Sequence, residues 1–246
     1  MKIRDAFRLF GRKREEQLAE LAYLRCKNDP GIILADEFAA AAMIRENGVR
    51  MVRIDGQAFE STPLLQKIER AEFFDNLKNL VRNAVEPSSN VDRHLPEPAY
   101  EERVAVEAVI HDHCMLRAKM DGLGFKQFFS APVIHTAFHG ATNMNRLASA
   151  WHSDDVNVVS ACLHGTGTEY LEGAITAQDR SLVAQGARLP SRIRARTTGP
   201  GEILVLHGRE VSRNEKQYSD DLSAQIHRGG SLEGRRVVML YSLGPE

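Results

Sequence analysis

A histidine and an aspartate two residues apart, His152 and Asp154, are the side chains best placed to bind one metal ion together. They lie between two predicted strands, residues 145–150 and 156–163, and alternate residues of an extended chain project to the same side. An imidazole nitrogen and a carboxylate oxygen can then reach one cation. The pair alone is weak evidence, because the chain has nine histidines and a solvated loop also explains such a pair.

A distant histidine, His227, would complete a site of two histidines and one carboxylate, which leaves coordination positions open for a co-substrate and O2. Further motifs accompany these residues in a set order along the chain. They are a glycine-rich turn at residues 164–171, Pro200-Gly201-Glu202 before an apolar strand at residues 203–206, and Gly234-Arg235-Arg236 at the start of a last strand.

This ordered set resembles the iron(II)- and 2-oxoglutarate-dependent oxygenases, whose catalytic unit is a double-stranded β-helix. It is also similar to a family of uncharacterised bacterial proteins with the same late motifs. The resemblance covers roughly residues 146–243 and rests on several motifs in order. It implies that His152 and Asp154 are the proximal metal ligands and that His227 is the distal one.

The same resemblance implies that Arg236 pairs with the distal carboxylate of 2-oxoglutarate. A guanidinium suits this task because it is planar, bidentate and permanently charged. Its neighbour Arg235 is the alternative, since only one of two adjacent strand residues can point into a barrel. The family's spacing from Gly234 favours Arg236.

The implied cofactors are iron(II), the co-substrate 2-oxoglutarate and O2, and the implied reaction is hydroxylation of a small molecule or of an amino acid or peptide. Desaturation or demethylation would use the same residues. One alternative is a cupin-like jelly roll that binds metal without turnover, in metal homeostasis or partner binding. The other is a partner-binding module in which the barrel is only a scaffold.

Several other residues are candidates for substrate contact or for support of the ligands. These are Trp151, Asn157, Thr168, Tyr170, His135 and His139. A rival metal pair, His111 and His113, is disfavoured because these positions lie on different faces of a predicted helix. The arginine-rich segment 174–196 is either a lid over the site or a surface insertion.

The elements that must position these residues divide the chain into two parts. Residues 1–122 are predicted to be mainly helical, and residues 123–246 to form a jelly-roll barrel, within one integrated domain of the α+β class. Helices are expected at residues 15–26, 37–46, 62–80 and 100–120, with a short strand at 49–54. After residue 124, short apolar segments punctuated by glycine, proline and asparagine predict strands at 125–138, 145–150, 156–163, 203–206 and 236–243.

Composition gives bounds on the class of protein. The 246 residues carry a formal net charge of -1, which gives no field to attract nucleic acid or an anionic membrane. The three cysteines form no CxxC pair, so a reducing cytoplasm is expected. No segment predicts a membrane span, a phosphate-binding loop or a nucleophile elbow. The oligomeric state is left open.

Overall fold

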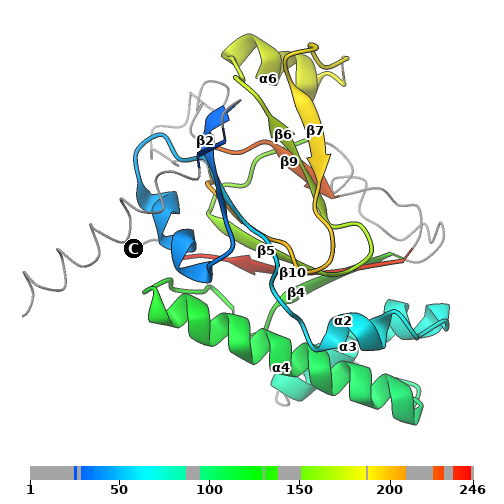
Figure 1. Cartoon of the computed structure of the whole chain (residues 1–246). Coiled ribbons are helices and arrows are strands. Elements are labelled where there is room, and N and C mark those ends of the chain that lie inside the picture. Colours follow the sequence, from blue (N-terminus) through cyan, green and yellow to red (C-terminus); the bar gives the residue numbers. More distant parts are fainter. Residues whose placement is uncertain are drawn as a thin grey trace, which may run out of the picture.

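The computed structural model describes residues 25–26, 29–86, 95–129, 131–137, 151–186, 188–208, 224–229 and 235–244. The predicted helix at 15–26, apart from its last two residues, the predicted strand at 145–150 and His139 lie outside these ranges. Within them the chain forms helices and two β-sheets (Figure 1). The α+β class expected from the sequence is confirmed.

The large sheet has seven strands in the order β1-β2-β3-β8-β5-β10-β4. Their bounds are β1 (Arg25–Cys26), β2 (Asp29–Ala35), β3 (Met51–Ile54), β8 (Ile203–Leu206), β5 (Val158–His164), β10 (Arg236–Ser242) and β4 (Val133–Ala137). Neighbouring strands are antiparallel, except for the parallel pair β2 and β3. Apolar strands from both ends of the sequence therefore share one sheet.

The small sheet has three strands in the order β7 (Arg194–Thr197), β6 (Thr168–Glu172) and β9 (His227–Gly229). An isolated antiparallel bridge between His152 and His227 extends it on the β9 side. From β4 to β10 the chain passes repeatedly between the sheets. Strands β4, β5, β8 and β10 belong to the large sheet, while the bridge segment, β6, β7 and β9 belong to the small one.

Helices cover one face of the large sheet, and the small sheet lies on its other side (Figure 1). The covering elements are the 3-10 helix η2 (Phe38–Arg45) and the α-helices α2 (Ser61–Leu65), α3 (Ala71–Val85) and α4 (Tyr100–Gly122). Strand residues alternate between the two faces, as the pleat requires. Val205 joins the core under the helices, whereas Leu204 and Leu206 pack with Tyr170 of the small sheet.

Three expectations for the first part of the chain need correction, and one further strand had no predicted counterpart. The last two residues of the helix predicted at 15–26, Arg25–Cys26, form β1, which pairs with β2. The segment at 29–35 is a strand, because Ile33 is buried towards the helices and Ile32 towards the small sheet, so both faces are apolar. The helix predicted at 62–80 is two helices, α2 and α3, with buried Ile68 between them. The alanine-rich segment forms a 3-10 helix. The division at residue 122 stays a prediction, although the large sheet takes strands from both sides of it.

The segment 174–196 contains α6 (Ala177–Ala184) and β7. Val183 of α6 packs with Leu171 and Ile226. Tyr170 packs towards the large sheet, so strand alternation places its neighbour Leu171 on the outer face of the small sheet. Thr176 and Asp179 begin the helix with a reciprocal capping box. Of the two alternatives for this segment, the contacts favour an insertion that covers the outer face of the small sheet over a lid.

Candidate metal centre

The backbone places the two histidines opposite each other. His152 N donates to His227 O at 2.9 Å, and His227 N donates to His152 O at 2.8 Å. Direct partners in an antiparallel bridge project to the same face, and two residues further along extended chain Asp154 returns to that face. The bridge thereby brings the local His-x-Asp motif next to His227, which lies 75 residues after His152 in the sequence.

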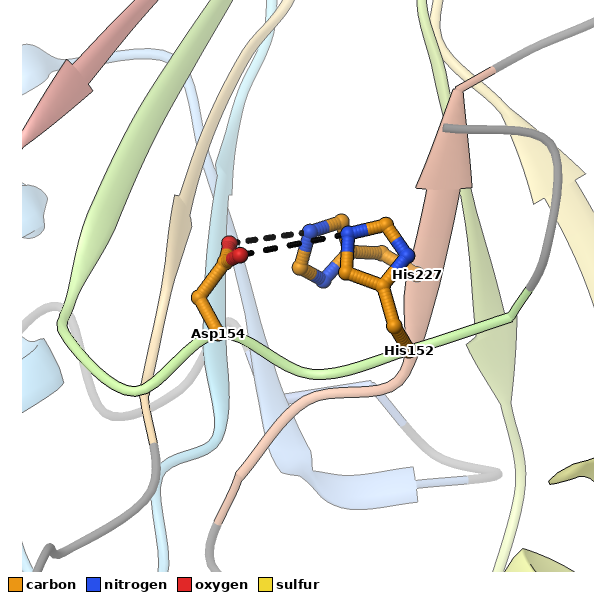
Figure 2. A group of neighbouring side chains, drawn as sticks. All are labelled: His152, Asp154 and His227. Atoms are coloured by element: carbon orange, nitrogen blue, oxygen red, sulfur yellow. Dashed lines mark ion pairs between the residues drawn. The ribbon is translucent and has the colours of Figure 1, made fainter. Parts of the chain in front are cut away.

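The three side chains converge on one point (Figure 2). His227 Nε2 lies 3.1 Å from Asp154 Oδ2, and His152 Nε2 lies 3.9 Å from Asp154 Oδ1. One ligand atom from each residue lies within 4.8 Å of the others. The donor set, two imidazole nitrogens and one carboxylate oxygen, fits a divalent first-row metal ion. Within the described ranges this is the one such group of histidine, cysteine and acidic residues.

The three side chains of this cluster differ in how far they are exposed to solvent. The His227 side chain is 9% exposed, while those of Asp154 and His152 are 33% and 37% exposed. His227 Nδ1 lies 3.2 Å from Gln225 O. When Nδ1–H donates to that carbonyl, the tautomer leaves the Nε2 lone pair directed at Asp154 and the cation position. The site is therefore anchored on the His227 side and reached from the side of His152 and Asp154.

Arg236, the first residue of β10, is 2% exposed. Val237 and Met239 belong to the core under the helices, so Arg236 and Val238 face the small sheet. Burial lowers the pKa of the Arg236 guanidinium, and the nearby Cys162 and Glu169 partly counteract this. Arg235 instead donates a hydrogen bond to the carbonyl of Ile68, between α2 and α3. The two arginines thus lie on opposite sides of the sheet, as strand alternation requires.

Trp151 lies away from the ligand cluster. The Arg228 guanidinium lies 4.3 Å from the centre of its ring, and the ring packs against the apolar group that contains Leu171 and Ile226. Arg228 also forms a 2.6 Å ion pair with Glu169. These contacts put Trp151 on the outer face of the small sheet, where it packs behind the segments that carry His152 and His227.

Two of the other candidates have structural hydrogen bonds. Asn157 Oδ1 accepts a hydrogen bond from Gly208 N at 2.9 Å, which fixes the turn after β8. Thr168 Oγ1 lies 2.8 Å from Ser160 Oγ, and both side chains are buried. Because Ser160 belongs to the large sheet and Thr168 to the small one, this bond links the two sheets.

Tyr170 is the direct strand partner of His227, so its ring lies on the same face of the small sheet. It is 1% exposed, and its hydroxyl accepts a hydrogen bond from Arg53 Nη1 at 3.1 Å. Burial raises the pKa of Tyr170, and the Arg53 hydrogen bond opposes that rise. Arg53 also pairs with Glu202, so a charged network supports the Tyr170 side chain beside His227.

The remaining histidines are separated. His135 lies on β4, His113 Nδ1 lies 3.0 Å from Tyr241 Oη, and His111 Nδ1 lies 3.3 Å from Glu60 Oε2. His111 and His113 therefore have different partners and do not form the rival metal pair.

A buried ion pair that the sequence did not reveal joins the two sheets. Arg50 Nη2 lies 2.5 Å from Asp29 Oδ2, and that carboxylate also accepts hydrogen bonds from Gly31 N and Gly173 N. Gly173 directly follows β6, whereas Asp29 begins β2. The spacing of these residues gives no motif, because the pairing depends on two strands meeting in space.

No protein-family model matches the sequence, and no curated protein matches it. Among solved structures, the chain is similar to a C-terminally truncated protein from Neurospora crassa, crystallised in its apo form. The two share 11% sequence identity, with 89% of this chain and 97% of that chain covered and a TM-score of 0.35. In the described ranges, no helix combines the length and apolar character needed to cross a bilayer.

Proposed function

We propose that this protein is an iron(II)- and 2-oxoglutarate-dependent oxygenase. The observation that carries the proposal is the convergence of His152, Asp154 and His227, with ligand atoms within 4.8 Å of one another. Two histidines and one carboxylate are typical of non-haem iron(II) sites that keep coordination positions open for a co-substrate and O2. The anchoring of His227 through Nδ1 and the greater exposure of the other two ligands both support such a site.

The proposed architecture is a double-stranded β-helix with its interior between the two sheets. The alternation of strands between the large and small sheets supports it, as does the apolar packing of Tyr170 against Leu204 and Leu206. In this arrangement the metal ligands and Arg236 face the same interior.

Each residue has a distinct role in the proposed mechanism. When bound, a metal with 2-oxoglutarate and O2 would supply the oxidative chemistry for hydroxylation of a substrate C–H bond. His152, Asp154 and His227 would hold the metal, and Gln225 O keeps the Nδ1 proton of His227 away from it. Arg236 binds the far carboxylate of the dianion and fixes its orientation. The packed interior around Tyr170 limits access of water from behind the distal ligand.

The substrate is proposed to be a small molecule or an amino-acid or peptide side chain, and neither nucleic acid nor a membrane is proposed as a partner. The formal net charge of -1 supports the exclusion of polyanionic partners. All three cysteines, Cys26, Cys114 and Cys162, are free thiols, which supports action in the reducing cytoplasm.

Anaerobic titration tests the proposal. The metal-free protein is titrated with iron(II) and then with 2-oxoglutarate, and the visible charge-transfer absorption of the chelate is recorded. The same titration is made with His227→Ala and Arg236→Met, and with His111→Ala as an exposed control. We expect the absorption in the original protein and in the control, and its loss in the other two variants at equal ligand concentration.

The outcomes separate two functions. Absorption that requires both His227 and Arg236 supports the oxygenase proposal, and succinate release under air is then the measure of turnover. Tight metal binding without any effect of 2-oxoglutarate would refute it in favour of a cupin-like metal-binding jelly roll, which has no need of Arg236.

A further inference from the structure

His135 and Arg236 lie on the same face of two neighbouring strands. His135 pairs directly with Val238, and Val238 pairs directly with Cys162 on its other side, so these residues form one row across β4, β10 and β5. Ile134 belongs to the core under the helices, and therefore His135 projects to the opposite face, towards the small sheet. Arg236 is two residues from Val238 on this face, diagonal to both His135 and Cys162.

The interior is closed on the Cys162 side of Arg236. Cys162 is 1% exposed, and its thiol lies 3.6 Å from Gly165 O and 3.8 Å from His164 O. A Cβ placed on Gly167 would lie 2.0 Å from Thr198 Oγ1 and 2.9 Å from Cys162 Cβ, so the small sheet approaches here as closely as a glycine allows. An anion that reaches Arg236 must therefore lie on the other side, where His135 is only partly buried on the edge strand β4.

The charges around His135 also suit an anion. Burial lowers the pKa of its imidazole, and the positive charges of Arg236 and of Lys78 on α3 lower it further. Burial raises the pKa of the Cys162 thiol to about 12, so the thiol stays neutral, and Glu169, which favours the charged form of Arg236, also pairs with Arg228. A carboxylate between His135 and Arg236 would interact favourably with both side chains.

We infer that His135 and Arg236 together bind the distal carboxylate of the acidic co-substrate, with His135 on the open side of the binding site. This inference rests on the proposed function. It makes His135 a residue that contacts the co-substrate and leaves the primary substrate to the side of the site where His152 and Asp154 are exposed.

Calorimetric titration of the full chain, saturated with manganese(II), tests the inference. The first probe is 2-oxoglutarate, and the second is 2-oxobutyrate, which has the same metal-chelating end but lacks the distal carboxylate. A hydrogen bond to a charged group is worth enough that His135→Ala should weaken 2-oxoglutarate binding about tenfold. The affinity for 2-oxobutyrate should stay unchanged. His135→Asn, which keeps a hydrogen-bond donor, should recover part of the loss, and His111→Ala should have no effect.

The controls distinguish the ways in which the inference can fail. Unchanged 2-oxoglutarate affinity in His135→Ala, together with a loss in Arg236→Met, would overturn the role of His135 and leave the proposed function standing. An equal loss for both probes would show damage to the strand, which also overturns the inference. Absence of 2-oxoglutarate binding in the original metal-loaded protein would overturn both proposals.

Discussion

Replacement of Asp29 by alanine should be among the most destabilising single changes in the described part of the fold. Asp29 is only 1% exposed. Its partner Arg50, whose Nη2 lies 2.5 Å from Asp29 Oδ2, is 8% exposed. Asp29→Ala removes the acceptor of Gly31 N at 3.0 Å and of Gly173 N at 2.9 Å, and it leaves the Arg50 cation buried. Loss of one partner of a buried pair costs about 3–5 kcal/mol.

Urea unfolding followed by circular dichroism measures this cost. With a slope of about 3 kcal/mol/M, the midpoint should fall by roughly 1–2 M. Asp55→Ala is the matched control, because Asp55 pairs with Arg53 at 2.7 Å but its side chain is 47% exposed. That exposed pair should contribute less than about 1 kcal/mol. The double variant Asp29→Ala/Arg50→Met should be less destabilised than the two single changes added together, since it leaves neither charge buried alone.

An Asp29→Ala midpoint no lower than that of Asp55→Ala would refute the assignment of Asp29 and Arg50 as the link between the sheets. Metal affinity provides an independent measure. Gly173 directly follows β6, which carries Tyr170 opposite His227, so a looser link should also weaken metal binding.

Three further predictions concern close packing, acid stability and metal binding. Gly167→Ala should lower the free energy of unfolding by about 1–3 kcal/mol, because the new Cβ would lie 2.0 Å from Thr198 Oγ1. Gly199→Ala, whose Cβ meets only Glu202 Oε2 at 3.8 Å, should have a much smaller effect in the same urea titration. The Asp179 pKa is lowered by hydrogen bonds from the Thr176 side chain and backbone, so its stabilisation is present above the ordinary aspartate pKa of about 4 and lost as the pH falls below it. Thermal melts at about pH 5 and about pH 3 should therefore show a smaller loss of stability on acidification for Asp179→Asn than for the original protein. Equal losses would contradict this role of Asp179. Manganese(II) at about 100 times its dissociation constant should stabilise the chelator-treated protein by about 2.7 kcal/mol, and a similar gain in His227→Ala would argue against the metal centre.

The strands of the C-terminal part were the most predictable elements of the fold. Segments such as 203–206 and 236–242 are apolar on both faces and bounded by turn residues, so their burial between two layers follows from their composition. The strand at Asp29–Ala35 was missed because its first residues include Pro30 and Gly31, which usually end an element. Gly31 has a tertiary reason for its place, since a Cβ there would lie 2.7 Å from Arg50 Nε.

The candidate site was predictable in part for the same physical reasons. Alternation along a strand separates Arg235 from Arg236 in any register, but only the chain order of the motifs connects His227 with His152. The helix at Ala177–Ala184 carried a readable signal in Thr176 and Asp179, whose spacing is that of a capping box. The partners of Asn157 and Trp151 carried no such signal, because Gly208 and Arg228 come to them only through the fold.

The position of β10 has a consequence for how the chain folds. This strand, formed near the end of the sequence, lies between β4 and β5 and pairs with both along its length. The pairing of Met51 with Leu206 likewise joins distant parts of the chain. During synthesis, β4 leaves the ribosome before residues 236–242 have been added. Until then β4 has no pairing partner among the described strands of the large sheet, because β10 is the strand that joins it to β5. Vectorial folding from the N-terminus is therefore not available to this sheet, and we expect slow, late and cooperative folding with a need for protection of apolar surface during synthesis.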